Sequence, residues 1–234
     1  MRFALSGNDA IVAVMDAPTP SKDKTPRRTS GERDPERTRG AILAAATEEF
    51  TTHGLNGARV DEIARRSGVN KRMIYYYFGD KNGLYLAVLE EIYADIRNAE
   101  IRLHLTDRDP VDAMRELVAF TWNYFIEHPE FLSLLSTENL HRAQHLKTSK
   151  KIRELHSPLV GIITALLARG VKAKAFRPGI DPVQLYITIA SLGFFYMSNR
   201  FTLSTIFGRD LGNAEALAER GSLIEDVVLR YLRP

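Results

Sequence analysis

One short segment of the chain carries side chains suited to binding nucleic acid. Residues 71–78 read KRMIYYYF, and a helix over this segment would bury Ile74 and Phe78, which are four residues apart. Four side chains remain for the opposite face: Lys71, Arg72, Tyr75 and Tyr76. Cationic groups bind phosphate or guanine, and a tyrosine hydroxyl can reach a phosphate or a base edge. The pattern therefore favours contact with DNA over an ordinary solvated surface.

Two further cations flank this segment. Lys81 falls in the first turn of the next predicted helix, where the helix N-terminus and the ammonium group both favour a phosphate. Arg59 stands just before a predicted helix at 60–67, a position that a capping side chain often occupies. We expect Arg59 to reach a phosphate there instead.

The elements that must position these side chains form a helix-turn-helix. The helix at 60–67 has Val60, Ile63 and Ala64 on one face, and Gly68 follows it with the freedom to make a tight turn. Asn70 is a good cap for the helix at 71–78.

The rest of the chain reads as helix after helix, which predicts an all-α fold of about nine helices. Asp-Pro pairs mark three helix starts, at residues 34, 109 and 181, because Asp caps free N–H groups and Pro needs no partner in the first turn. The expected helices are 35–53, closed by Gly54, then 60–67, 71–78, 81–103, 110–127, 130–145, 150–169, 182–200 and 213–232. Pro158 should kink or split the helix in which it falls.

Charge and composition agree with a nucleic-acid partner. The 234 residues carry a net charge of +3, and residues 22–81 hold 13 basic and nine acidic residues, a net +4. The chain has no cysteine, which excludes disulfides, cysteine-ligated metal centres and a thiol nucleophile, and is compatible with a reducing cytoplasm. It also contains no GxSxG, GxxxxGK[ST], GxGxxG or HExxH motif, so we do not expect an enzyme.

The N-terminal residues 1–33 are rich in polar residues and lack periodicity, so we expect a disordered tail without a signal peptide. The apolar stretch 182–197 is too short and too polar to span a bilayer, and we expect a buried helix and no membrane partner.

The segment EIARRSGVNKRMIYYYFGDKNGLYLAVL resembles the DNA-binding domain of the TetR family of bacterial transcriptional regulators, over about residues 36–90. The resemblance implies that Tyr75 and Lys81 match the family's phosphate-contacting tyrosine and lysine. Arg59 departs from the family pattern, in which Thr or Ser often stands. The segments ENLHRAQHLKTSKKIRELHSPL, FRPGIDPVQLY and FYMSNRFTLSTIFGRDL are similar to one C-terminal domain type of the family, with a looser likeness to RutR-type catabolic regulators.

The resemblance implies a helix-turn-helix domain at 34–80 and a ligand-binding and dimerisation domain at 81–234. In a homodimer, the helices at 182–200 and 213–232 would pair with their copies through Tyr186, Ile189, Ala190, Phe194, Ile224 and Val228. Two recognition helices about 34 Å apart would then read a palindrome in double-stranded DNA. A small-molecule effector would lie among Trp122, Phe125, Phe131, Asn139, His141, Phe195 and Asn199, although residue by residue we favour plain core packing, because aromatic spacing on helices mostly reflects the core.

The leading hypothesis is therefore a cytoplasmic repressor that releases its operator when a small molecule binds. A DNA-binding or interaction module without ligand control is the alternative, and an enzyme is a weaker one. His141 and His145 are four residues apart, with Glu138 as the nearest further metal ligand, but we interpret them as surface or capping residues. We expect no metal and no cofactor.

Overall fold

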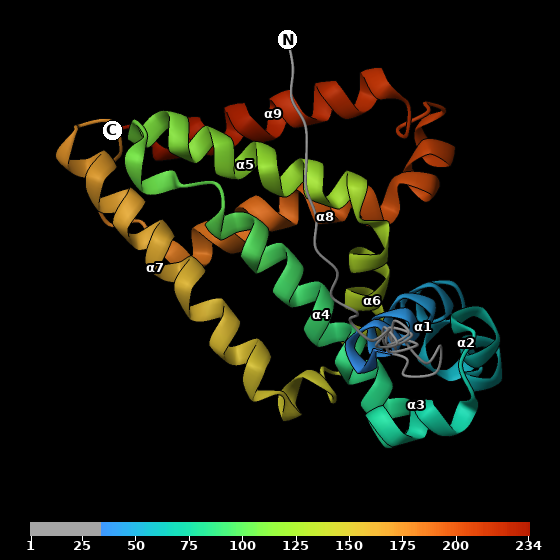
Figure 1. The fold of residues 1–234 in the computed structure, drawn as a ribbon. Coiled ribbons are helices and arrows are strands. Elements are labelled where there is room, and N and C mark those ends of the chain that lie inside the picture. Colours follow the sequence, from blue (N-terminus) through green and yellow to red (C-terminus); the bar gives the residue numbers. More distant parts are fainter. Residues whose placement is uncertain (1–33) are drawn as a thin grey trace, which may run out of the picture. The chain divides into compact units, whose positions relative to one another are not determined.

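The computed structural model describes residues 34–234, apart from the side chains of residues 155–157. In this part of the chain nine α-helices and two short 3-10 helices follow one another, and no strand is present (Figure 1). The predicted all-α fold is confirmed. The tail predicted at residues 1–33 lies outside the described residues.

The first three helices build the helix-turn-helix region. They are α1 (Pro35–Gly57), α2 (Val60–Ser67) and α3 (Lys71–Phe78). The Asp34 side chain caps α1 by accepting the backbone N–H of Glu36 at 3.0 Å. Gly54 has φ 65° and ψ 175°, so regular helix ends there, as predicted, and a short turn continues to residue 57.

Six further helices follow in the described residues: α4 (Lys81–Ile101), α5 (Pro110–Glu127), α6 (Pro129–Leu140), α7 (Lys150–Lys172), α8 (Pro182–Phe207) and α9 (Ala214–Leu232). The 3-10 helices η1 (Leu105–Asp107) and η2 (Leu146–Thr148) lie in the connections before α5 and α7. Asp109 and Asp181 cap α5 and α8 through their side chains, as their Asp-Pro pairs predict.

Several helix ends differ from the prediction. The expected helix 130–145 stops at Leu140 because the buried carboxylate of Glu138 accepts the backbone N–H groups of His145 and Leu146, at 2.8 and 3.0 Å, and so folds the chain into a turn. Helix α8 runs seven residues beyond the expected 200, to Phe207, and Gly208 closes it with a φ of 62°. Helix α7 continues across Pro158 without a break, so the expected split does not occur.

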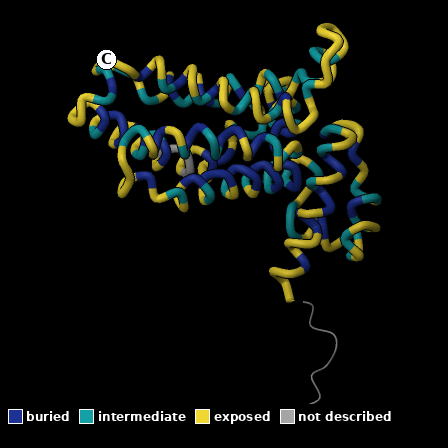
Figure 2. Tube along the Cα trace, turned by 90° about the horizontal axis from the view of Figure 1, so that it is seen from above, coloured by how far each residue is buried: buried dark blue, intermediate teal, exposed yellow. Residues whose placement is uncertain are grey.

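A continuous hydrophobic core connects the helix-turn-helix to the remaining helices. Figure 2 shows the buried positions along the inner faces of the helices. Helix α4 packs against α1, α3 and α7. Tyr85 on α4 meets Phe50 on α1 edge to face, with ring centroids 5.1 Å apart, and its hydroxyl donates to the carbonyl of Leu134 on α6 at 3.3 Å. These contacts hold α1 against α4 and α6, so α4 is packed directly on the first helix of the helix-turn-helix region.

None of the helices in the described part of the chain is long and apolar enough to cross a membrane.

Candidate nucleic-acid interface

The turn between α2 and α3 has the geometry that its sequence predicts. Gly68 adopts the left-handed conformation, with φ 66° and ψ 23°, which only glycine adopts at little cost. The Asn70 side chain then caps α3 by accepting the backbone N–H of Arg72 at 2.9 Å. Helix α3 is thus fixed at its first turn.

Helix α3 has one buried side and one open side. Ile74 is 1% exposed and packs into the core, whereas Tyr75 and Tyr76 are 42% and 79% exposed. Arg72 is exposed as well. A tyrosine exposed to this extent on an eight-residue helix contributes little to the core, so its ring and hydroxyl are available to a partner.

Lys71 is held by a neighbouring helix. Its Nζ lies 2.8 Å from Oδ1 of Asp61, in the first turn of α2. The hydrogen bond to Asp61 raises the pKa of Lys71 above its usual value. Lys71 can therefore reach a phosphate only by giving up Asp61, a competitor that the sequence reasoning overlooked.

Lys81 joins α4 to the last turn of α1, beyond Gly54. Its Nζ donates to the backbone carbonyl of Asn56 at 3.2 Å, and the Asp80 side chain caps α4 by accepting the N–H of Gly83 at 2.7 Å. Lys81 is partly exposed, so its remaining N–H groups lie at the surface near the start of α4.

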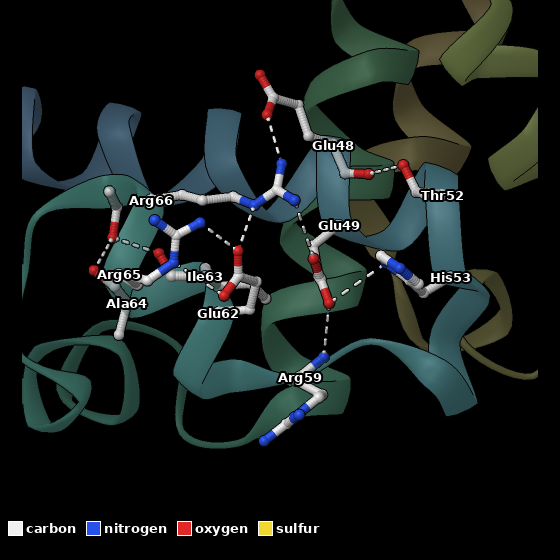
Figure 3. A network of polar contacts seen from close by, with 11 residues as sticks. Glu48, Glu49, Thr52, His53, Arg59, Glu62, Ile63, Ala64, Arg65 and Arg66 are labelled. Atoms are coloured by element: carbon white, nitrogen blue, oxygen red, sulfur yellow. Dashed lines mark hydrogen bonds and ion pairs between the residues drawn. The ribbon is translucent and has the colours of Figure 1, made fainter.

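Arg59 precedes α2 without a side-chain cap, and a residue from α1 takes that role. Oε1 of Glu49 accepts the backbone N–H of Arg59 at 3.0 Å, as Figure 3 shows. Glu49 is 2% exposed, and His53 and Arg66 lie 3.4 and 3.9 Å from its carboxylate. The Arg59 side chain is exposed. A lone glutamate on the otherwise apolar side of α1 was the sequence signal for this contact, and it was missed.

Helix α2 carries an arginine-glutamate network on its outer side (Figure 3). Glu62 accepts hydrogen bonds from Arg65 and Arg66, and Arg66 also contacts Glu48 on α1 at 3.1 Å. The hydrogen bond from Arg65, followed by that from Arg66, lowers the pKa of Glu62 to about 2. The network ties α2 to α1 and leaves α3 as the open face of the motif.

The residues expected to line an effector pocket divide between the core and the surface of the described part of the chain. Three of them lie in the core: Trp122, Phe125 and Phe131 are at most 5% exposed. The rings of Phe125 and Phe131 stack at 6.1 Å, and a side-chain carbon added at Gly193 would lie 3.0 Å from the Phe125 ring and 3.4 Å from that of Trp122.

The other four lie near or at the surface. Phe195 is 59% exposed, and the side-chain amide of Asn199 donates to its carbonyl at 2.8 Å. Asn139 is exposed and His141 is partly exposed, and both bond back to their own helix turn. Their role in binding an effector stays a prediction.

His145 stabilises the turn after α6 rather than facing a free surface. Its Nδ1 lies 2.9 Å from Oε2 of Glu138, which is 1% exposed. The rings of His141 and His145 are 6.4 Å apart. Within residues 34–234 no group of three or more metal-ligating side chains occurs.

Helices α8 and α9 carry apolar side chains that a single chain leaves exposed. Three residues at helical spacing on α8 are Val183, Ile187 and Phe201, with 44%, 49% and 73% exposure. On α9, Leu223, Val227 and Tyr231 are 40% to 49% exposed.

The residues expected at a dimer interface divide into two groups. Ile189, Ile224 and Val228 are at most 2% exposed and already pack within one chain. The Tyr186 hydroxyl accepts a hydrogen bond from Arg97, so this side chain also points inward. Ala190 and Phe194 are partly exposed. A partner would therefore rest on the exposed residues of α8 and α9 more than on the buried ones.

Comparisons with known proteins agree with this architecture. Residues 42–88 match the family described as "Bacterial regulatory proteins, tetR family", and residues 110–228 match "Tetracyclin repressor-like, C-terminal domain". The HTH-type transcriptional repressor NicS of Pseudomonas putida is 44% identical over 198 residues, which cover 85% of this chain and 93% of NicS. The HTH-type transcriptional regulator RutR of Escherichia coli is 29% identical over 197 residues, 83% of this chain and 90% of RutR.

A solved structure has the same fold. The putative transcriptional regulator SCO4942 from Streptomyces coelicolor superposes with a TM-score of 0.63 at 26% sequence identity, covering 84% of this chain and 99% of SCO4942. The helix-turn-helix, the helical C-terminal part and these relatives indicate a DNA-binding regulator and not an enzyme. The chain belongs to the TetR family of bacterial transcriptional regulators.

Proposed function

We propose that this protein is a homodimeric repressor that binds a palindromic operator and is released from it by a small molecule. Its relative NicS is named a transcriptional repressor. Since its partner is chromosomal DNA, the protein acts in the bacterial cytoplasm. The division into a DNA-binding domain at 34–80 and a ligand-binding and dimerisation domain at 81–234 is part of this proposal.

The open face of α3 carries the proposal. Arg72, Tyr75 and Tyr76 are exposed there, while Ile74 anchors the opposite side of the helix in the core. A guanidinium group can bind guanine through two hydrogen bonds, and tyrosine hydroxyls can bind phosphate. In the proposed complex Lys71, Lys81 and Arg59 add phosphate contacts around α3.

The exposed apolar residues of α8 and α9 support a dimer. When a second copy covers exposed side chains such as Ile187 and Val227, the buried apolar surface stabilises the dimer by about 25 cal/mol for each Å². A two-fold dimer presents the same surface twice, so its two α3 helices bind two half-sites related by the same symmetry.

Helix α4 supports control by a ligand. Lys81 bonds to Asn56 at its start, and Tyr85 packs on Phe50 one turn later. Helix α4 also packs against α7, and Arg97, Glu100 and Ile101 near its C-terminal end border a slit lined by α7 residues. A ligand that prefers a different position of α4 in the C-terminal helices therefore also prefers a different position of α3, and lowers operator affinity by that difference.

The test is a selection of operators from random double-stranded DNA with the purified protein, followed by anisotropy titrations. A palindromic site should emerge, and Arg72→Ala should weaken its binding roughly 10-fold or more. Arg102→Ala is the matched control, since Arg102 is also an exposed arginine but follows α4. Selection without any enriched sequence, or equal losses in the two variants, would refute the proposal.

A further inference from the structure

The C-terminal half of α4 buries an ion pair. Arg97 and Glu100 are each 2% exposed, and Nη1 of Arg97 lies 2.8 Å from Oε2 of Glu100. Removing two charges from water costs several kcal/mol per ion, which is recovered only when the surrounding hydrogen bonds are complete. An ion pair placed this deep therefore calls for partners on every side.

Those hydrogen bonds are incomplete. Nη2 of Arg97 donates to the Tyr186 hydroxyl on α8 at 3.0 Å. Nε and Nη1 of Arg97 and Oε2 of Glu100 have no hydrogen-bond partner among the described side chains and backbone, because the Nη1 to Oε2 contact is close but poorly directed. Most buried polar groups in proteins are hydrogen-bonded, so a guanidinium whose Nε has no partner and whose Nη1 meets only the Glu100 carboxylate is unusual.

The ion pair borders a narrow slit between α4 and α7. The slit has a volume of about 160 Å³, is too narrow to admit a water molecule, and has apolar walls formed by Ile101, Pro158, Leu159 and Ile162. The slit therefore combines a buried cation, whose Nε has no hydrogen-bond partner, with apolar walls.

We propose that Arg97 binds the carboxylate of a small organic acid that enters this slit. A carboxylate offers two oxygens in the spacing of the guanidinium fork, so it can accept from Nε and from a terminal nitrogen together. The apolar body of the acid would lie against Leu159 and Ile162 on α7. One negative charge balances one positive charge, whereas a phosphate dianion would leave a buried charge uncompensated.

Glu100 can give up its ion pair with Arg97 when the ligand binds, because it is readily protonated. Burial raises the pKa of Glu100 to about 7, although the charge of Arg97 acts in the opposite direction. Once protonated, Glu100 no longer competes for Arg97 and can donate a hydrogen bond to the bound carboxylate.

The inference rests on the proposed function, because it names the chemical class of the effector. Arg97 lies 16 residues after Lys81 on the same helix, about 24 Å along its axis at 1.5 Å per residue. The slit must widen to admit a ligand, and widening moves α4 relative to α7. The same helix holds the helix-turn-helix through Tyr85 and Phe50, so binding at Arg97 is transmitted to α3.

The test measures binding of a panel of small carboxylates, including benzoate and hexanoate, by calorimetry on the full chain without DNA. Each acid is paired with its carboxamide and with the matching amine. Carboxylates should bind at least 10-fold more tightly than their partners, and Arg97→Met should abolish this preference. Arg102→Met changes an exposed arginine directly after α4 and should retain this preference. A preference for the amine, no preference, or a preference that survives Arg97→Met would overturn the inference.

Glu100→Gln keeps the test decisive if Arg97→Met does not fold. Since this change removes the competing carboxylate, it should tighten benzoate or hexanoate binding at least 5-fold at pH 8, and unchanged or weaker binding would overturn the inference. A parallel operator titration separates the two proposals. Intact operator binding without carboxylate preference refutes the effector class alone, whereas carboxylate binding without operator recognition refutes the proposed function alone.

Discussion

The ammonium group of Lys71 lies 2.8 Å from the carboxylate of Asp61, and this contact joins the two helices of the helix-turn-helix. Lys71 is the first residue of the helix that carries the proposed DNA contacts, yet in the free protein its charge is already paired. The pair stabilises the motif at the surface, and it must open when Lys71 binds a phosphate.

We therefore predict that Asp61→Asn strengthens binding to DNA, by about 2- to 5-fold, because Lys71 then reaches a phosphate without losing a partner. The affinity should also fall more steeply with salt. In a plot of the logarithm of the binding constant against the logarithm of the salt concentration, the slope should be steeper by up to about 0.9. Anisotropy titrations at several salt concentrations measure both. Glu116→Gln, which breaks an exposed pair with Arg108 near α5, is the control. A slope equal to that of the wild-type protein would contradict the role of Asp61.

The buried carboxylate of Glu49 should contribute measurably to stability, because it accepts the backbone N–H of Arg59 at the start of α2. Glu49→Ala leaves that N–H and Arg66 without this partner and should lower the free energy of unfolding by about 1–3 kcal/mol. Urea denaturation measures the change. The neighbouring Glu48, an exposed glutamate that also contacts Arg66, is the matched control, and Glu48→Ala should cost about 0.5 kcal/mol or less. Equal losses would show that Glu49 caps nothing.

The exposed apolar residues of α8 and α9 should hold the dimer together. Ile187→Glu combined with Val227→Glu places charges at exposed positions, so each chain should still fold while the dimer dissociates. Sedimentation should report a monomer, and operator affinity should fall roughly 100-fold or more when the two half-sites are no longer bound together. Leu140→Glu alters another exposed apolar residue, on α6, and should remain dimeric. A dimer that survives the double change would place the interface elsewhere.

Stability should depend on pH through Glu100. Burial raises its pKa to about 7, so between the ordinary value of 4.5 and 7 the native state holds a proton that the unfolded chain has lost. The contribution of Glu100 to the free energy of unfolding therefore falls as pH rises through this window, and the loss is complete above pH 7. Arg97 contacts Glu100 directly, Tyr124 interacts with it, and the Tyr186 hydroxyl lies on the other side of the Arg97 guanidinium.

Urea denaturation of the wild-type protein and Glu100→Gln at pH 5.5 and pH 8 isolates this contribution. The stability of the wild type relative to the variant should drop by about 2 kcal/mol between the two pH values, at about 1.4 kcal/mol per pH unit. If the stability of the wild type relative to Glu100→Gln is the same at both pH values, or is greater at pH 8, the raised pKa of Glu100 is contradicted.

Local signals in the sequence predicted most of the fold. Gly68 and Asn70 indicate the turn before α3 because a left-handed glycine and a side-chain cap act within a few residues, and the Asp-Pro pairs mark helix starts for the same reason. The end of α6 could not be predicted this way. It depends on Glu138 accepting N–H groups seven and eight residues later, which the periodicity of the helix does not reveal.

Of the candidate nucleic-acid interface, only the exposed side chains could be predicted from the sequence. Tyr75 and Tyr76 stand out because three successive tyrosines on a short helix cannot all be buried. The pairing of Glu49 with Arg59 and the hydrogen bond between Arg97 and Tyr186 join residues 10 and 89 positions apart. Such contacts depend on how helices pack, so the spacing of residues within one helix does not reveal them.

The most direct measurement of the central claim is the affinity for the selected palindrome and for the same palindrome with five base pairs inserted between its half-sites. Five base pairs rotate one half-site by about half a turn of DNA, so a dimer with two fixed α3 helices can no longer bind both. We predict that the insertion weakens binding roughly 100-fold or more, to the level of a single half-site. Equal affinity for the two DNAs would contradict a dimeric operator-binding protein.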